Sequence, residues 1–193
     1  MHHKGTQTLE TTRLVLRRYT MTDAGDMFEN WVTDPEVCRF WTWDPHKSIA
    51  ETKAVLAKWI AAYDDNETYH WVIVHKEAGQ AIGYIYLTDI DNQASSVSVH
   101  YLVSRAFWNR GFMTEACRAV AGFAFDVVGV QCIHTWHHVD NPASGTVMRK
   151  VGFRCVGTAY KQYPECERIN GNYDLYEMTK SMWVSLLQIH TAQ

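Results

Sequence analysis

Hydrophobic and polar positions alternate in some segments of the chain and recur every three or four residues in others. Alternation is typical of a strand with one buried face, and steps of three and four are typical of an amphipathic helix. Bounded by turn residues, the alternation predicts strands over residues 11–20, 70–76, 81–90, 95–104, 130–139, 153–162 and 172–180. Helical spacing and capping signals predict helices that begin near residue 22 and near residues 49, 112 and 142.

The helix boundaries are predicted from residues that cap the start of a helix or end it. Ser48 lies three residues before Glu51, a capping box for a helix over residues 49–63. Gly129 and Gly152 are placed to end two later helices, because glycine adopts the left-handed conformation without strain. The first of these helices has one predicted apolar face, formed by Phe112, Ala116, Val120, Phe123 and Val127.

The order of these elements defines a fold class. One strand and two helices precede a three-stranded meander, which is followed by helix, strand, helix and a final hairpin. Residues 77–80 supply a turn of the meander, and Asn170-Gly171 is expected to turn the last hairpin. The chain contains no repeat, low-complexity tract or linker. We therefore predict a single α/β domain over residues 1–193, with a mixed central sheet flanked by helices.

The amino-acid composition of the chain limits the classes of binding partner to be expected. The 193 residues are 47% hydrophobic and 20% charged, enough for one complete hydrophobic core. A net charge of -3 gives no electrostatic case for binding nucleic acid or an anionic membrane. No window approaches the run of about 18 apolar residues that a membrane span needs, and residues 1–8 lack the apolar core of a secretory signal. We expect a soluble, cytoplasmic protein.

The cysteine thiols and histidine imidazoles are the candidate metal ligands of the chain. The five cysteines are odd in number and form no CxxC pair, so we expect free thiols rather than a disulfide framework. His134 and His138 share a face of a predicted strand while His137 opposes them. No acidic or Cys partner lies at zinc spacing, so polar residues lining a cleft are preferred to a metal site, and no metal is expected.

The stretch "WNRGFMTEA" (residues 108–116) joins a predicted strand to a predicted helix through an Arg-Gly pair. Such a turn leaves several main-chain N–H groups unpaired at the helix N-terminus, where they attract an anion, usually a phosphate. Taken alone, an ordinary strand-to-helix connection explains the stretch equally well.

Five segments carry a family resemblance, namely "LETTRLVLRRYTMTDAGDMF", "DPEV", "WNRGFMTEA", "NPASGTVMRKVGF" and "YEMTKSMW". In this order and spacing they resemble the GNAT superfamily of acetyl-CoA-dependent N-acetyltransferases. More narrowly, they are similar to the branch of ribosomal-protein N-terminal alanine and serine acetyltransferases. The resemblance covers about residues 9–183, leaves residues 1–8 and 184–193 as expected tails, and implies a GNAT-like fold. A homodimer stays open.

The resemblance implies that acetyl-CoA is the co-substrate and that the Arg-Gly turn holds its pyrophosphate. The implied contacts are Leu102, Val103, Asn109, Arg110, Gly111, Phe112, Met113, Thr114, Asn141 and Ser144. Asn109 and Met113 depart from the family pattern. Asn tolerates the left-handed conformation of the Gly it replaces. Met113 would crowd a phosphate unless its side chain points into the core.

Catalytic roles are also implied by the resemblance. Ser144 is the expected general acid for the departing thiolate, although a helix-start Ser with a local hydrogen bond is the plainer alternative. Ser98 stands where many relatives have a Glu and is assigned to the acceptor side. For the base, Glu167 ranks first and His100 second. Trp41 and Trp43 are expected as walls of the acceptor pocket, or equally as a lid over the core.

These residues favour an N-acetyltransferase that acts on a primary amine, with a protein N-terminus such as that of a ribosomal protein as the first choice. A small-molecule amine, such as an aminoglycoside or a polyamine, is the alternative within the same class. An acetyl-CoA-binding sensor without turnover is the alternative from another class, because Ser98 and the altered phosphate turn both depart from the family pattern.

Overall fold

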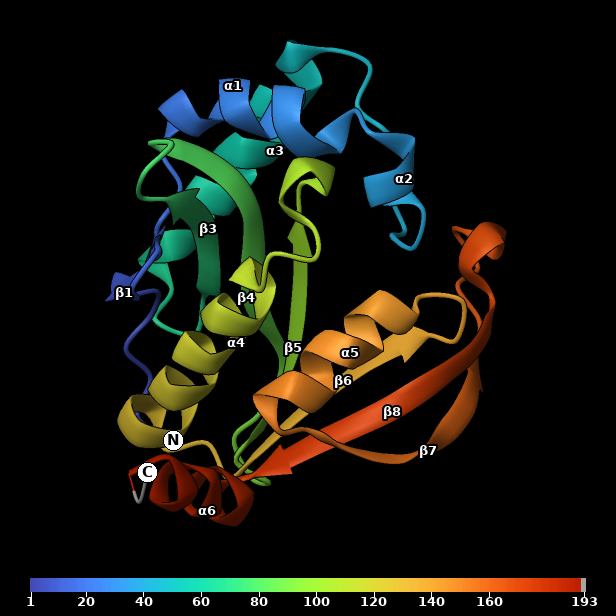
Figure 1. Ribbon diagram of the computed structural model, residues 1–193. Coiled ribbons are helices and arrows are strands. Elements are labelled where there is room, and N and C mark those ends of the chain that lie inside the picture. Colours follow the sequence, from blue (N-terminus) through green and yellow to red (C-terminus); the bar gives the residue numbers. More distant parts are fainter. Residues whose placement is uncertain (192–193) are drawn as a thin grey trace.

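An eight-stranded sheet runs through the molecule, and the computed structural model describes residues 1–191 (Figure 1). The strands are β1 (Leu9–Glu10), β2 (Leu14–Arg17), β3 (Tyr69–His75), β4 (Gln80–Asp91), β5 (Ser96–Val103), β6 (Cys132–His138), β7 (Arg154–Lys161) and β8 (Gly171–Thr179). The helices are α1 (Ala24–Met27), α2 (Pro35–Cys38), α3 (Ile49–Ala61), α4 (Phe112–Phe123), α5 (Pro142–Val151) and α6 (Lys180–Thr191). The predicted single domain with a mixed sheet is confirmed.

The strands follow the order β1-β2-β3-β4-β5-β6-β8-β7, and β5 and β6 are the only parallel neighbours among the described strands. Their ladder contains three residue pairs and ends at Ser98 opposite His134. Beyond this point the two strands separate, as Figure 1 shows. The Thr135 hydroxyl donates to the Val99 carbonyl over 2.9 Å just past the last pair. From there on, one edge of β5 has no partner strand.

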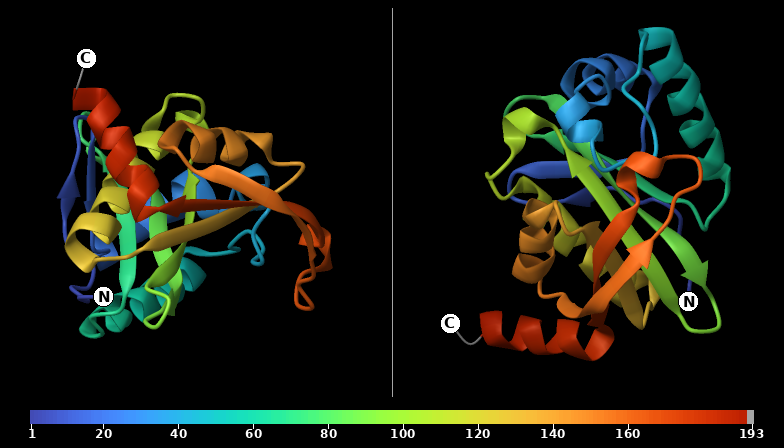
Figure 2. Two further views of the ribbon diagram at one scale, coloured as in Figure 1. Left: turned by 90° about the horizontal axis from the view of Figure 1, so that it is seen from below. Right: turned by 90° about the vertical axis from the view of Figure 1, so that its right-hand side faces the viewer.

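Both faces of the sheet are covered (Figure 2). On β3, Trp71 and Ile73 point into a core shared with α4 and α6, while Val72 points into a second core shared with α1 and α3. All three side chains are buried. Strands covered on both faces read as continuous apolar runs, which is why the polar residues that interrupt β5 and β6 are informative.

In the helix after the Arg-Gly turn, the buried face differs from the predicted apolar face at one residue. Phe112 and Val120 are buried as expected, but Val127 is 43% exposed and Val128 is buried instead. The reason is a π-helical turn at Ala124–Val128, which adds a residue to the helical repeat and rotates the following side chains. Gly129 then ends the segment at φ 82°, as predicted.

The last hairpin also differs from the prediction. Strand β8 begins at Gly171, so Asn170-Gly171 does not form a two-residue turn. A longer connection with a 3-10 turn at Glu167–Ile169 joins β7 to β8 instead. This connection is long enough to reach over the neighbouring strands, and it contributes to the cavity described below.

Residues at the N-terminus, expected as a tail, pack against the domain, and residues 192–193 of the expected C-terminal tail lie outside the described residues. The Thr6 hydroxyl donates to the Thr68 carbonyl over 2.9 Å and accepts from the His70 N–H over 2.8 Å, so the first residues lie along the start of β3. At the other end, α6 continues to Thr191 and buries Trp183 against the core. The first predicted strand is shorter than expected, at Leu14–Arg17.

Candidate active site

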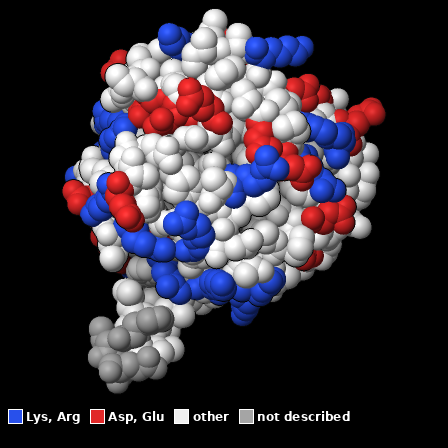
Figure 3. Space-filling view, turned by 45° about the horizontal axis from the view of Figure 1, so that its top comes forward, with Lys and Arg blue, Asp and Glu red and all other residues white. Residues whose placement is uncertain are grey.

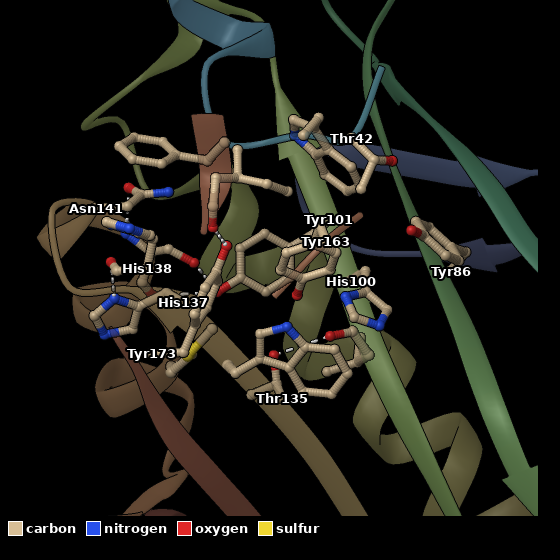
Figure 4. A pocket seen from close by; sticks show the side chains of 17 residues that line it. Thr42, Tyr86, His100, Tyr101, Thr135, His137, His138, Asn141, Tyr163 and Tyr173 are labelled. Carbon is tan, nitrogen blue, oxygen red and sulfur yellow. Dashed lines mark hydrogen bonds between the residues drawn. The ribbon is translucent and has the colours of Figure 1, made fainter. Parts of the chain in front are cut away.

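A cavity of about 220 Å³ lies where β5 and β6 separate (Figure 4). Its walls come from the loop after α2, from β4, β5 and β6, from the first turns of α5, and from the connection before β8. Among the predicted site residues, those that line this cavity are Trp41, His100, Asn141 and Ser144. Trp43, Ser98 and Glu167 do not line it.

The cavity passes through the sheet from one face to the other. On β5, His100 and Tyr101 are consecutive and therefore point to opposite faces, yet both line the cavity. Tyr101 contacts Ser144 on the α5 side, while His100 packs against Tyr86 on the side of α1–α3. This is feasible because β6 has separated from β5 at this level.

The α5 side of the cavity is built around a capped helix start. Asn141 caps α5 by accepting from the Ser144 N–H over 3.4 Å, and Pro142 occupies the first turn. The Tyr101 hydroxyl lies 3.2 Å from Ser144 Oγ and also 3.2 Å from the Ser144 carbonyl oxygen. Burial raises the pKa of the Tyr101 phenol, so this hydroxyl keeps its proton at neutral pH. Tyr101 is a second proton donor beside Ser144.

Sequence reasoning missed Tyr101, although a signal was available. The alternation along β5 places Tyr101 opposite to His100, and α5 follows the neighbouring strand directly. A phenol on that face therefore had to approach the first turn of α5.

His137 presents a ring nitrogen without a hydrogen bond to the same region, 3.8 Å from the Asp174 carboxylate. Its Nδ1 lies 2.8 Å from the His138 carbonyl oxygen and so carries the proton, which leaves Nε2 as a bare acceptor. Within residues 1–191 that Nε2 is buried without a hydrogen-bond partner. A Cβ atom at position 145 would collide with the His137 ring, so Gly145 permits this close approach. A buried, unsatisfied acceptor that lines a cavity is a site for a ligand N–H or a water.

The opposite face carries a row of four rings, which we call the aromatic ladder: His70, Tyr86, His100 and Trp136, of which the last three line the cavity. Cross-strand register places them side by side, since His70 pairs with Tyr86 and Tyr86 with His100. Successive ring centroids are 5.2, 5.3 and 4.7 Å apart. Lys161 ends the ladder, with Nζ 3.3 Å from the Trp136 ring centroid. Such rings pack at the spacing that aromatic pairs prefer.

The titratable groups at the aromatic ladder are partly or largely buried, which disfavours their charged forms. Burial lowers the pKa of His100 to about 4, Asp89 opposes the shift and Lys161 adds to it. Burial also lowers the pKa of Lys161, against the effect of Asp89. His100 is therefore a neutral imidazole at neutral pH, with a lone pair able to accept a proton.

Two loops form the roof of the cavity and are held together by Arg168. Its guanidinium donates to the Trp41 and Trp43 carbonyl oxygens, each over 2.8 Å, and to Asp44 over 3.1 Å. Trp41 thereby lines the cavity, whereas Trp43 packs against the second core. Glu167, next to Arg168, is exposed and is not among the residues that line the cavity.

The Arg-Gly turn contains two left-handed residues, one of them at Asn109, for which this conformation was predicted to be tolerated. Asn109 is left-handed at φ 59° and Gly111 at φ 81°. The Met113 side chain is 5% exposed and packs into the main core, so it does not crowd the turn. Gly111 caps α4 without a side-chain hydrogen bond, which leaves the first N–H groups of the helix available. The Trp108 indole N–H donates to the Val103 carbonyl over 2.7 Å.

Arg13 on the segment before β2 braces this turn. Its guanidinium donates to the Arg110 carbonyl over 3.0 Å and to the Glu115 carboxylate over 2.6 Å, and it lies 4.3 Å from the centre of the Phe112 ring. A shallow hollow beside the turn is lined by acidic, basic and neutral residues. Thr114, Arg118 and Lys150 are among them. Of the other predicted cofactor contacts, Leu102 is buried in the second core.

The remaining sequence-based candidates do not gather into a site. Within residues 1–191, no group of three His, Cys, Asp or Glu side chains is placed to hold a metal ion. The five cysteines are all free thiols. In the same part of the chain, no helix is both long and apolar enough to cross a bilayer.

Comparison with known proteins agrees with this geometry. Residues 13–154 match the family model described as an acetyltransferase (GNAT) domain. A Bacillus subtilis protein named uncharacterized N-acetyltransferase YoaA is 28% identical over 155 residues, 80% of this chain and 86% of its own. The ribosomal-protein-S5-alanine acetyltransferase of Vibrio fischeri superposes with a TM-score of 0.75 at 18% identity, over 92% of this chain and 98% of that one. The spermidine N-acetyltransferase of Vibrio cholerae, solved with CoA and spermine, superposes with a TM-score of 0.74 at 17% identity, over 90% and 99%.

The low pKa of His100 predicts a pH-dependent stability. An unfolded His titrates near 6.5, so between about pH 6.5 and 4 the unfolded chain binds a proton that folded His100 does not. The free energy of unfolding should therefore fall as the pH drops through this window. His100→Gln should reduce that fall by about 1–2 kcal/mol in denaturant titrations, with exposed His134→Gln as the control. Equal pH dependence in the wild type and His100→Gln would contradict the burial of this imidazole.

Proposed function

The chain belongs to the GNAT family of acetyltransferases, and from that premise we propose that it transfers the acetyl group of acetyl-CoA to the α-amine of a protein N-terminus. It is an acetyl-CoA-dependent N-acetyltransferase by family. The observation that carries the proposal is the cavity that crosses the sheet where β5 and β6 separate. Proton donors line it on one face and a neutral imidazole on the other, so two substrates can meet inside it from opposite sides.

Several features of the chain fit acetyl-CoA. The left-handed turn at Asn109 and Gly111 directs the free N–H groups of α4 toward one point, where a pyrophosphate gains both hydrogen bonds and the helix dipole. Past Ser98, β5 has an edge of unpaired main-chain groups that the amides of a pantetheine arm can satisfy. The bare Nε2 of His137 offers one more acceptor near the first turn of α5.

Acetyl-CoA supplies a thioester, which a neutral amine attacks with release of a thiolate. The chain has to take one proton from the amine and give one to the sulfur. His100 holds a lone pair on the acceptor face, and Ser144 with Tyr101 holds hydroxyl protons on the α5 face. We assign His100 to the base and the Ser144–Tyr101 pair to the acid. Glu167 is exposed outside the cavity, so the geometry favours His100 of the two candidate bases.

The turn before α4 can be tested by cofactor affinity. Gly111→Val places a branched side chain where the pyrophosphate would approach, and calorimetric affinity for CoA should fall by at least about tenfold. Gly79→Val is a matched control, because Gly79 also has a positive φ, 66° against 81°, and has no neighbour within 4 Å of an added Cβ. Both variants should lose similar stability, and only Gly111→Val should lose affinity. Equal CoA affinities in the two variants would remove the pyrophosphate from this turn.

Turnover can be tested by thiol release from acetyl-CoA in the presence of peptides with a free N-terminus. Wild-type protein should release CoA at a peptide-dependent rate, and Ser144→Ala should lower kcat and kcat/KM together by roughly 10- to 100-fold, because it removes a donor needed only as the C–S bond breaks. Tyr101→Phe should do the same, and the double variant should lose less than the product of the two losses. Thr146→Ala, exposed on the same helix, is the control.

Two results of this assay would redirect the proposal. Retention of kcat within about twofold in both Ser144→Ala and Tyr101→Phe would remove the pair from the mechanism. Binding of acetyl-CoA with no release of thiol for any amine would indicate a sensor rather than an enzyme.

A further inference from the structure

The acceptor face of the cavity has a chemistry of its own, and we propose that it selects an α-amine whose side chain is uncharged and flat or apolar and whose adjacent carbonyl or carboxylate group binds Lys161. The proposal deepens the function proposed above and rests on it. The aromatic ladder would hold the side chain, and Lys161 would hold the group on the α-carbon. Polyamines and other multiply charged amines would be disfavoured.

Shape and polarity of the lining carry the first part. Tyr86 and Trp136 form the floor, and Phe40, Trp41 and Tyr163 close over them from the two loops that Arg168 joins. Figure 4 shows Tyr86 and His100 on one side of the cavity and His138 and Asn141 on the opposite side. Rings on floor and roof leave a slot whose best occupant is a planar or aliphatic group, since aromatic pairs gain beyond simple burial.

The charges around the cavity carry the second part. No Asp or Glu lines it in the described chain. Of the nearby acids, Asp44 pairs with Arg168, while Asp174 accepts from the Thr158 hydroxyl and lies 3.8 Å from His137 Nε2. Asp89, which acts on His100 and Lys161, is exposed outside the lining. On the face seen in Figure 3, acidic side chains are interspersed with basic ones rather than gathered. A second ammonium on the acceptor would therefore meet no carboxylate in the lining itself.

Lys161 is not itself in the cavity lining, but it lies against Trp136, which is, and in the proposal it marks the end of the cavity where an oxygen of the acceptor binds. Its ammonium sits over the Trp136 ring, which in turn meets His100 edge-on at 4.7 Å. A cation over an indole is held in place without losing its hydrogen-bonding capacity. An aromatic slot alone would also suit an ammonium ligand, but Lys161 already occupies the Trp136 ring and repels a further cation. An acceptor with an oxygen close to its reacting amine is the complementary partner.

The reacting amine itself fits this class. An α-amine titrates near 7.7–8.0 and an alkylamine near 10.4, so the α-amine is far more often neutral at pH 7. The cavity offers the neutral imidazole of His100 and no carboxylate base. An α-amine therefore needs less help from a base to become neutral than a polyamine does.

Equilibrium affinity for the protein–CoA complex, measured by calorimetry, tests the class separately from turnover. The probes are L-phenylalaninamide, L-lysinamide, spermidine, 2-phenylethylamine, free L-phenylalanine and a short peptide that begins with Phe. Phenylalaninamide should bind at least about tenfold more tightly than lysinamide or spermidine. Spermidine binding as tightly as phenylalaninamide would overturn the proposal. The free acid and the peptide distinguish an amino acid from a chain terminus as the source of the α-amine.

Lys161→Met tests the contact to the carbonyl group and keeps the aliphatic stem over Trp136. It should weaken phenylalaninamide roughly tenfold and leave 2-phenylethylamine, which lacks the carbonyl, within about twofold. Lys53→Met, exposed on α3, is the control. Equal losses for both ligands in Lys161→Met would overturn the assigned role. The predicted binding order without any turnover would rule out the enzymatic function and support the inference. Turnover with spermidine preferred would support the enzymatic function and rule out the inference.

Discussion

The short parallel ladder between β5 and β6 is the constraint on which the site depends. A backbone edge that leaves its partner inside a covered sheet must find other hydrogen-bond partners, because unpaired buried N–H and C=O groups are costly. Here the pairing ends at Ser98 and His134, and the Thr135 hydroxyl satisfies one carbonyl just beyond. The rest of that edge faces a cavity rather than a strand. Everything that we assign to catalysis lies on the two sides of this separation.

The separation also explains why consecutive residues are assigned to different substrates in the proposed reaction. His100 and Tyr101 are adjacent in sequence and face opposite sides of the sheet. Burial lowers the pKa of the imidazole to about 4 and raises the pKa of the phenol, so one is an unprotonated acceptor and the other a protonated donor. The low polarity of the cavity thus sets both groups in the protonation state that acetyl transfer to a neutral amine requires. An aromatic floor follows, because the same strands carry Tyr86 and Trp136 on the acceptor face.

Much of the fold could be predicted because the signals are local. Caps at Ser48 and Asn141 and the left-handed conformation at Asn109 depend on neighbours within a few residues, and each was found where expected. The predictions that failed depend on contacts between distant segments or on a change in the helical repeat. The π-turn that exposes Val127 breaks the helical repeat, and the connection before β8 replaces a tight Asn-Gly turn. In the site, Ser144 and His100 were placed by motif and alternation. Tyr101 and the Arg168 contacts to the Trp41 loop arise only when distant segments pack together.

The most direct test of this account is a crystal structure of the protein with a bisubstrate ligand, CoA joined through its sulfur and an acetyl bridge to the nitrogen of phenylalaninamide. We predict that the pantetheine arm runs between β5 and β6, with the sulfur within hydrogen-bonding reach of Ser144 or Tyr101 and the phenyl group on the aromatic ladder. A ligand that lies wholly on the outer surface of α4 and α5, with β5 and β6 still separated around solvent, would contradict the central claim.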